Sequence, residues 1–305
     1  MRALRVACDI GATNLRVASF DARGIVLRAE TATPHGGGAD AIVGALVEKI
    51  SEVVPARTAI SGICAGVPAP VDARRGLVRE ASNLPELVGV RLLPLLREYF
   101  PVPLLIRNDA MLATVGEHRF GAGRGVRNMA YFTISTGIGG GIIAGGRLFA
   151  GARGHAGEMG EMIFGDPTNP AKLETVASGG AIARLASAAS GRAVAEAARL
   201  GDPSARRIIE TAAAYIAFGV VNVLHLFNPE LVVLGGGVMR SADLILPIVR
   251  KTAARLAMAS SHVEIVAGSL GDDAGLFGGA ALLEDRNKHR TQLRVVRRGR
   301  RPARR

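Results

Sequence analysis

The sequence predicts two α/β domains of related design with an interdomain cleft. The chain has 305 residues, which is more than most single domains contain and enough to bury two cores. Residues 4–20 combine a buried strand, a tight turn and a partner strand, and residues 129–146 repeat this plan around a Gly-rich turn. Helical segments and short apolar strands follow each copy, as in layered α/β folds. Ligands of such folds collect at strand ends and in crevices.

The first domain is predicted to be rich in strands. Apolar runs bounded by turn residues predict strands at residues 4–8, 15–20, 25–31, 58–65 and 102–106. Apolar side chains at helical spacing predict helices at residues 39–54 and 92–99. The fourth strand ends in the breaker-rich residues 66–70, and Asn108-Asp109 follows the fifth at the predicted domain junction. A catalytic group is expected at such a junction.

The second domain is predicted to repeat this order with more helix. Strands are predicted at residues 129–134, 231–234 and 263–266, with β character again at residues 142–143. Helices are predicted at residues 110–120, 172–188, 204–227 and 240–258, and a Gly/Pro-rich loop at residues 150–170. A last helix begins near Asp272. We therefore expect a smaller domain of residues 1–108 with about 272–285, and a larger domain of residues 109–271.

Composition indicates a soluble, cytoplasmic protein. A hydrophobic share of 49% and a charged share of 21% exclude wholesale disorder. Cys8 and Cys64 stand far apart in apolar stretches, so we expect core thiols in a reducing compartment rather than a disulfide framework. No signal peptide is expected from the first residues. The apolar segment 208–227 carries Asn222 and His225, which favours a buried helix over a membrane span.

The net charge of +12 is concentrated at the C-terminus. Ten of the 38 Lys and Arg residues lie in residues 286–305, where no acid occurs. The other 285 residues carry 28 Lys and Arg against 26 acids and are nearly neutral. We therefore expect a disordered, solubilising tail at residues 286–305, with at most weak electrostatic contact with nucleic acid and none with a membrane.

The first candidate ligand site is the turn after the first strand. Asp9 ends that strand and is followed by Gly11, Ala12, Thr13 and Asn14. Small residues allow the main chain to approach a ligand, whose anionic oxygens can meet main-chain N–H groups and the Thr13 hydroxyl. Asp9 can hold Mg²⁺, directly or through water, because hard cations prefer oxygen ligands. Taken alone, an ordinary hairpin turn explains the motif equally well.

The second candidate is the segment 135–141, which contains four glycines and includes Thr136, Gly137 and Gly139. Glycines between strands cost conformational entropy on folding, so we expect them to be present because a ligand approaches the main chain closely. A phosphate is the obvious ligand. A simple glycine-rich turn is the alternative. Residues 139–144 nominally fit the dinucleotide-binding fingerprint, but a strand follows where that fingerprint needs a helix, and no P-loop motif occurs.

The third candidate is Gly235-Gly236-Gly237, between a strand and a helix. Glycines there leave a flat surface suited to a planar base, although a helix entry with unusual dihedral angles is an equally good interpretation. Two phosphate-type hairpins and one glycine surface together predict a nucleotide bound across the cleft.

Seven motifs follow one another along the chain: residues 9–16 (DIGATNLR), 66–72 (GVPAPVD), 108–110 (NDA), 135–141 (STGIGGG), 154–160 (GHAGEMG), 234–238 (LGGGV) and 272–281 (DDAGLFGGAA). This is the order found in ROK-family sugar kinases, and the chain resembles that family over about residues 4–284. The resemblance implies the actin-like ATPase (ribonuclease H-like) fold, ATP with Mg²⁺, and phosphoryl transfer to a hexose hydroxyl.

The resemblance also implies roles for individual residues. Asp109 matches the catalytic base, which accepts the proton of the 6-hydroxyl as that oxygen attacks the γ-phosphate. Asp109 also suits the N-cap position of the helix that follows it. Positions matching sugar-binding residues of the family are Gly66, Asn83, Asn108, Glu158 and Glu174.

The chain departs from the family pattern after residue 160. The family follows its motif with a His and then a Cys-rich stretch that binds structural zinc, whereas here Glu161 replaces the His and no cysteine follows. We therefore expect no zinc site. His155, Glu158 and Glu161 are three residues apart, but without a softer ligand a replacement metal site is disfavoured. We expect Pro167, Pro170 and packing to hold the loop, and Glu161 either to contact sugar or to face water.

The favoured function is an ATP-dependent hexokinase of the glucokinase type, with glucose the favoured sugar and possible tolerance of others. An N-acetylhexosamine or fructose kinase is the alternative in the same class, and polyphosphate is an alternative donor. A sugar-responsive ROK regulator is disfavoured, because the first phosphate motif begins at Asp9 and leaves no room for an N-terminal helix-turn-helix. The family also implies a homodimer or homotetramer.

Overall fold

The computed structural model describes residues 3–81, 83–259 and 263–299, with only the main chain described for residues 289–299. The chain divides into two compact units: unit 1 is Met1–Leu112 with Gly275–Arg305, and unit 2 is Ala113–Ala274. These boundaries fall a few residues after the expected ones. The chain first passes from unit 1 to unit 2 after Leu112, inside helix α3 (Asp109–Phe120) rather than at the start of that helix.

Unit 1 is built on a five-stranded sheet of order β3-β2-β1-β4-β7. Its strands are β1 (Leu4–Ile10), β2 (Asn14–Phe20), β3 (Ile25–Ala32), β4 (Ile60–Val67) and β7 (Leu104–Asn108). The first three strands are antiparallel, whereas β4 and β7 run parallel to β1. The carboxyl ends of β1, β4 and β7 therefore meet at one edge, with Asp9 opposite Gly66 and Val67 opposite Asn108.

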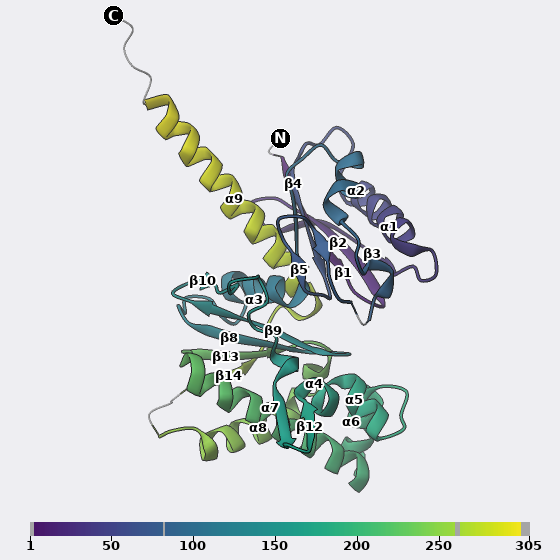
Figure 1. Ribbon diagram of the computed structural model, residues 1–305, viewed down its shortest axis with the longest axis vertical. Helices are drawn as coiled ribbons and strands as arrows, with labels where there is room; N and C mark the ends of the chain where they lie inside the picture. The colour runs from purple at the N-terminus through teal and green to yellow at the C-terminus, as the bar shows by residue number, and fades with distance from the viewer. Residues whose placement is uncertain (1–2, 82, 260–262, 300–305) are drawn as a thin grey trace, which may run out of the picture. The chain divides into compact units, whose positions relative to one another are not determined.

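Helices cover both faces of this sheet (Figure 1). The remaining elements of unit 1 are α1 (Gly38–Val53), β5 (Val71–Asp72), β6 (Leu77–Val78), η1 (Pro85–Leu87), α2 (Leu92–Tyr99) and α9 (Ala274–Gly299). Successive side chains of β1 point to opposite faces, so Val6 packs with the cluster that contains α1 and α2, and Ala7 packs with α9. On the α9 side, the rings of Phe20 and Phe277 meet edge to face at 5.4 Å.

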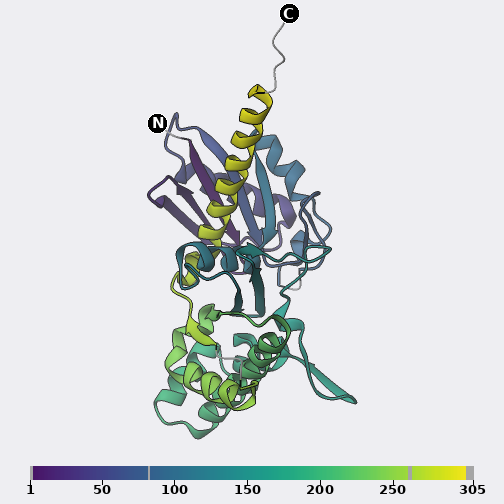
Figure 2. The same ribbon diagram turned by 90° about the vertical axis from the view of Figure 1, so that its left-hand side faces the viewer.

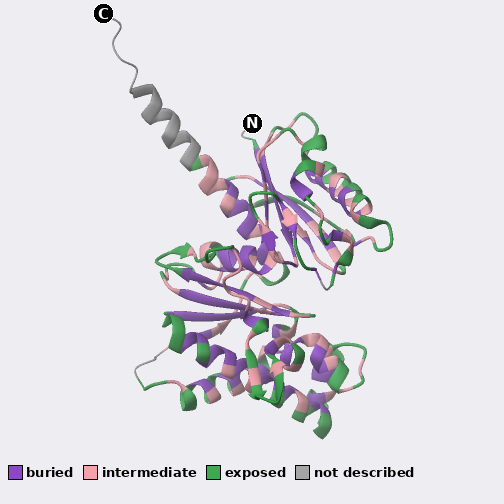
Figure 3. Ribbon diagram, viewed as in Figure 1, coloured by how far each residue is buried: buried purple, intermediate pink, exposed green. Residues whose placement is uncertain are grey.

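Unit 2 repeats this sheet in the order β10-β9-β8-β13-β14. Its strands are β8 (Met129–Ile134), β9 (Ile138–Ala144), β10 (Arg147–Leu148), β13 (Leu231–Gly235) and β14 (Glu264–Ala267). Again three strands are antiparallel and two run parallel to the first, β8. Each unit therefore has the same sheet topology, as the repeated order of elements predicts. The central strands of both sheets are buried (Figure 3).

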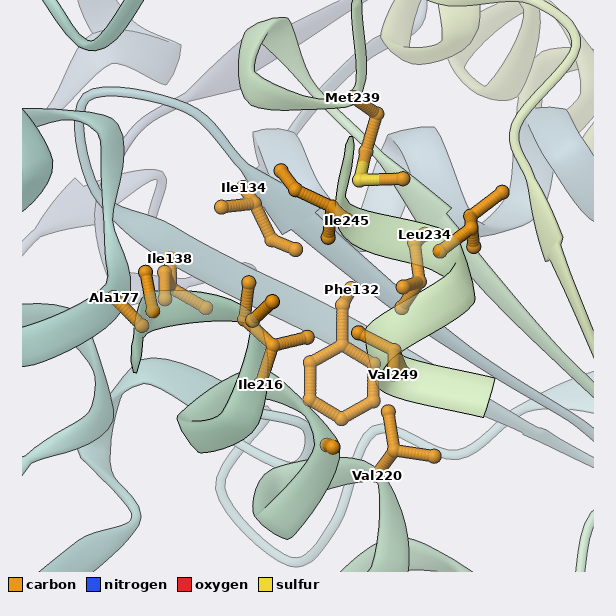
Figure 4. Close-up of a cluster of buried hydrophobic side chains, with 14 of the residues drawn as sticks. Phe132, Ile134, Ile138, Ala177, Ile216, Val220, Leu234, Met239, Ile245 and Val249 are labelled. Atoms are coloured by element: carbon orange, nitrogen blue, oxygen red, sulfur yellow. The ribbon is translucent and has the colours of Figure 1, made fainter. Parts of the chain in front are cut away.

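The helices of unit 2 form its main core against the sheet (Figure 4). They are α4 (Leu173–Ala177), α5 (Gly179–Leu185), α6 (Gly191–Arg199), α7 (Pro203–Phe227) and α8 (Ala242–Leu256), with the short helices η2 (Met159–Glu161), η3 (Gly237–Ser241) and η4 (Gly271–Asp273). Phe132 of β8 is fully buried among side chains of α7 and α8. Among the described helices, α7 alone is long and apolar enough for a membrane span, but 56% of its most apolar window is buried within the protein.

Three expectations differ from the structure. The segment predicted as a loop at residues 150–170 contains η2, β11 (Ile163–Asp166) and the start of β12 (Asn169–Lys172), which pair as a hairpin. The helix predicted at residues 172–188 is two helices, because Ser178 leaves helical geometry and its hydroxyl caps α5. Finally, α9 continues through residues 286–299, where a disordered tail is predicted, while residues 300–305 lie outside the described residues.

Candidate active site

Asp9 lies at the carboxyl end of β1, half-buried, beside the start of α9. A Cβ atom on Gly275 would lie 3.8 Å from the carboxylate carbon of Asp9 and 4.0 Å from the main-chain oxygen of Asp109. The two acidic residues that the sequence singles out therefore adjoin the same glycine within unit 1. Arg16, opposite Asp9 on β2, places its Nη1 at 3.7 Å from Oδ2 of Asp9.

The turn after Asp9 is tied back through its carbonyl groups. The N–H of Gly11 donates to Asn14 O at 2.9 Å, and a Cβ on Gly11 would lie 2.9 Å from that same oxygen, so glycine is required. Thr33 donates from its hydroxyl to Gly11 O at 2.7 Å and from its N–H to Thr13 O at 2.9 Å. No described residue accepts from the N–H of Ala12 or Thr13. This arrangement suits the binding of an anionic ligand.

His35 links this turn to a second segment of unit 1. Its Nε2 lies 2.8 Å from Ala12 O, and its Nδ1 lies 3.1 Å from Oε1 of Glu86. Both partners are acceptors, so the two hydrogen bonds form together when both ring nitrogens are protonated. The hydrogen bond to Glu86, followed by that to Ala12, accordingly raises the pKa of His35. Glu86 lies three residues after Asn83, an exposed residue that the family resemblance places at the sugar.

Asp109 opens α3, and its neighbour performs the capping. Oδ1 of Asn108 accepts from the N–H of Met111 at 2.9 Å, whereas Oδ1 of Asp109 accepts from the N–H of Ala110 at 2.6 Å. The prediction that Asp109 is the N-cap is therefore wrong. The N-cap is Asn108, because its side chain accepts the hydrogen bond from the third N–H group of the helix. A Cβ on Gly66 would lie 3.4 Å from Cα of Asp109, so β4 packs closely beneath this residue.

The two glycine-rich candidates of unit 2 lie side by side. β8 and β13 are parallel neighbours, with Thr133 opposite Gly235, so their carboxyl ends share one edge. A Cβ on Gly237 would lie 3.6 Å from Oγ of Ser135, which precedes the predicted phosphate residues Thr136 and Gly137. Gly236 has φ +86° and a Cβ on it would lie 2.5 Å from Ile134 O, so only glycine fits. Gly139 lies further on, within β9.

The three predicted sugar-side carboxylates of unit 2 share one neighbourhood. Burial, followed by the charges of Glu161 and Glu174, raises the pKa of Glu158. Oε2 of Glu174 accepts from the N–H of Ile138 at 2.8 Å and lies against Gly137. Glu161 is exposed and forms an ion pair with Lys172, with Oε2 at 2.7 Å from Nζ.

Packing of the segment that carries Glu158 also accounts for one of the glycines assigned from the sequence to phosphate binding. A Cβ on Gly140 would lie 2.4 Å from Cγ of Met159, and a Cβ on Gly157 would lie 2.7 Å from Cα of Gly141. These glycines of β9 and of residues 157–160 therefore allow two chain segments to pack together. A Gly-rich pattern in both segments was the available signal, but their pairing depends on tertiary contact.

The residues at the implied zinc positions do not fit that metal. Glu161 occupies the place of the family's His, and Lys172 stands two residues before Glu174, where the pattern has a Cys. An ammonium group cannot ligate a cation, and the two side chains are paired with each other. Over the described residues, no group of three or more His, Cys, Asp or Glu side chains is arranged to hold a metal ion, His155 and its neighbours included.

Comparison with known proteins identifies the class of this fold. The solved structure of a ROK-family glucokinase from Streptomyces griseus, in complex with glucose and AMPPNP, aligns with a TM-score of 0.81 and 29% identity, covering 92% of this chain and 99% of that one. The predicted fold class, the two-domain actin-like ATPase fold, is confirmed.

The sequence comparisons define the family. The ROK family profile matches residues 5–286, and the chain belongs to the ROK family. The bifunctional enzyme NanE/NanK of Brucella melitensis is 38% identical over 91% of this chain, which spans about half (53%) of that relative's length. The glucokinase of Halalkalibacterium halodurans is 32% identical, over 92% of this chain and 94% of the relative.

Proposed function

We propose that the protein is an ATP-dependent sugar kinase that transfers the γ-phosphoryl group of ATP to the 6-hydroxyl of a hexose, with glucose the favoured acceptor. The observation that carries this proposal is that the Asp9 carboxylate and the main chain of Asp109 adjoin the same glycine, Gly275, at the edge of the unit 1 sheet where β1 and β7 end. This proximity supports a base at Asp109 close to the proposed phosphate-binding turn. The glucokinase relative and the glucokinase structure support the reaction class.

Asp109 is proposed as the general base. Its carboxylate would accept the proton of the sugar hydroxyl while that oxygen forms a bond to the γ-phosphorus and the bond to the ADP oxygen breaks. Asp109 stands in the first turn of α3, where the helix dipole favours the ionised form of a carboxylate. Asn108 completes the helix cap, so capping does not depend on Asp109.

Each unit contributes one proposed phosphate contact: the N–H groups of Ala12 and Thr13 in unit 1, and the turn that includes Thr136 and Gly137 in unit 2. Carbonyl oxygens of the first turn are held by Thr33 and His35, so its N–H groups keep a fixed orientation. Of the three predicted glycines, only Gly237 is exposed and is proposed to face the adenine ring, since a planar base needs a region without side chains. Gly235 is buried against the Tyr131 ring and Gly236 packs on the main chain of Ile134.

Asp9 is the residue proposed to hold Mg²⁺. A single carboxylate next to a phosphate-binding turn fits this ion, which keeps several waters and takes its other ligands from the phosphates. When bound with ATP, Mg²⁺ neutralises charge on the transferring phosphoryl group.

The sugar is proposed to contact Asn83, Asn108, Glu158 and Glu174, whose donors and acceptors suit a polyol. Glu161, in place of the family's His, is the observation that keeps an N-acetylhexosamine or fructose kinase as the second candidate. The structure pairs Glu161 with Lys172, so any contribution of Glu161 to sugar binding would compete with that ion pair.

The test measures ADP release by the purified protein with a panel of hexoses, with ATP and Mg²⁺ and then with polyphosphate in place of ATP, product being followed as sugar phosphate. We expect Asp109→Ala to lower kcat by about 10²- to 10⁴-fold with little change in nucleotide binding. Asp40→Asn is the matched control, since Asp40 also lies in the first turn of a helix, α1, away from these residues. Turnover of no sugar would overturn the function, and near-normal turnover of Asp109→Ala would remove Asp109 as the base.

A further inference from the structure

The β11–β12 hairpin occupies the stretch where the ROK pattern has its zinc ligands, and its residues do not fit zinc. We propose that a metal-free anchor does the work of a metal cross-link here: Phe164 of β11 packs on Tyr215 and Phe218 of α7, the Glu161–Lys172 ion pair ties its base, and together they position Glu158 and Glu174 for the sugar. The positional part of this inference rests on the proposed function. Figure 2 shows the hairpin extending from the body of unit 2.

Three aromatic rings form the centre of this anchor. The centroid of Phe164 lies 6.1 Å from that of Tyr215, at an interplanar angle of 71°, and 6.3 Å from that of Phe218. Tyr215 and Phe218 meet edge to face at 5.8 Å. Such arrangements stabilise beyond the area that they bury. The whole chain has only nine Phe, three Tyr and no Trp, so a quarter of its aromatic residues are gathered at this hairpin.

Main-chain bonds and a buried leucine extend the anchor toward the site. Ile163 pairs with Lys172 at the base of the hairpin, and the N–H of Leu173 donates to Met162 O at 2.8 Å. Leu173 is fully buried, and its Cδ2 lies 3.0 Å from where a Cβ on Gly219 of α7 would be. The chain on both sides of the hairpin is therefore held against α7 without a metal.

Both ends of the anchored segment lead directly to the carboxylates. Glu158 precedes η2, which Glu161 ends, and Glu174 follows the buried Leu173. Glu174 then reaches the N–H of Ile138 on β9. Movement of the hairpin base would consequently displace Glu158 and Glu174 together, while the nucleotide residues of unit 1 would be unaffected.

The aromatic contacts should matter more than the ion pair. The side chains of Glu161 and Lys172 are 57% and 53% exposed, and exposed ion pairs contribute little because water and salt screen them. We therefore expect Phe164→Ala to raise the KM for sugar by about tenfold, and Lys172→Ala by about twofold or less.

The experiment combines metal analysis with kinetics of the full chain. Elemental analysis is expected to show no stoichiometric zinc, and 1,10-phenanthroline, which spares Mg²⁺, to leave both Tm and the KM for sugar unchanged. Phe164→Ala should raise the KM for sugar by a larger factor than the KM for ATP, since Glu174 adjoins the proposed phosphate contacts only at Gly137, and Phe164→Leu should recover most of the loss. Phe227→Ala, an exposed aromatic at the far end of α7, is the matched control.

Stoichiometric zinc, or a loss of Tm on treatment with phenanthroline, would overturn the metal-free anchor. An unchanged KM for sugar in Phe164→Ala would overturn its positioning role. If the wild type phosphorylates no sugar, the proposed function fails, and the anchor is then judged by hydrogen exchange at the N–H groups of Leu173 and Ile138. Faster exchange there in Phe164→Ala, and not in Phe227→Ala, is expected, and equal exchange would refute it.

Discussion

Gly66 offers a direct test of the link between packing and the proposed base, because it lies under the first turn of α3. A Cβ added at this position would lie 3.0 Å from Cδ1 of Leu112, 3.4 Å from Cα of Asp109 and 3.6 Å from Cys8 O. The contact with Leu112 is the tight one, so Leu112 must give by a few tenths of an ångström, whereas 3.4 Å to Cα of Asp109 is an ordinary packing distance. Because Leu112 is buried and lies in the same helix three residues after Asp109, we expect its displacement to shift the start of α3. Gly66→Ala therefore displaces the proposed base without changing its chemistry.

The size of the effect follows from that displacement. Extra volume in a packed site costs about 1–3 kcal/mol of unfolding free energy, which corresponds to a Tm lower by roughly 2–10 °C in units of this size. A misplacement of about 1 Å can cost about 100-fold in rate, so a few tenths of an ångström should lower kcat by about three- to tenfold. The KM for ATP should stay the same, since the Asp9–Asn14 turn does not contact Gly66 except through the strand pairing of Asp9.

The assay is steady-state ADP release together with thermal unfolding of the same samples. Gly44→Ala is the matched control, because Gly44 is exposed within α1 and nothing lies within 4 Å of its added Cβ. Alanine there should raise stability by about 0.5–1 kcal/mol and leave kcat unchanged. A Gly66→Ala protein with a lower Tm and an unchanged kcat would refute the coupling, and one with neither change would refute the packing argument.

Two further predictions follow from titrating groups. Burial raises the pKa of the Cys64 thiol to about 12, and burial together with the charges of Cys64 and Asp9 raises the pKa of Cys8 well above its usual range. Neither thiol should therefore react with a disulfide reagent at pH 8 until the protein unfolds. Fast labelling of the native protein would contradict this prediction. Because the pKa of His35 is raised and that of Glu86 is lowered, their ion pair stabilises the protein fully between pH 4.5 and 6.5. The Tm difference between wild type and His35→Ala should be largest in that range and should shrink as the pH rises through the raised pKa of His35. A Tm difference that does not vary with pH would contradict this prediction.

The elements that the sequence predicts well are those whose pattern is local. Residues 129–134 form a strand with the predicted bounds, since a continuous apolar run between turns has few other solutions. The hairpin β11–β12 was missed because its strands, IFGD and NPAK, are mostly exposed and contain Gly and Pro, which are poor strand formers. Phe164 of this hairpin packs against α7, and this contact with residues about 50 positions away is not visible in the local pattern.

The same division applies to the candidate site. The sequence places Asp9 and Asn108 each at the end of a buried strand. That both strands run parallel to β4, on either side of it, is seen only in the structure. The groups that hold the first turn could not be predicted, because Thr33 and His35 reach it only once β3 has paired with β2. The exchange of capping from Asp109 to Asn108 is a matter of one residue, which local pattern does not resolve.

Glycine-rich segments predict that something approaches the main chain closely, but not what approaches it. In the segment 135–141, some residues are proposed to contact a ligand and others contact the protein itself. Its turn carries the exposed Thr136 next to Ser135, whose Oγ adjoins Gly237, and remains the proposed phosphate contact. Gly137 lies against the Glu174 carboxylate, and Gly140 lies against Met159. One glycine motif therefore makes room for both carboxylate-bearing segments at the very turn where the phosphate is proposed. The proposed phosphate turn and the proposed sugar-binding carboxylates are separate in the sequence, and in unit 2 they are brought together by packing in which Gly140 leaves no room for a Cβ.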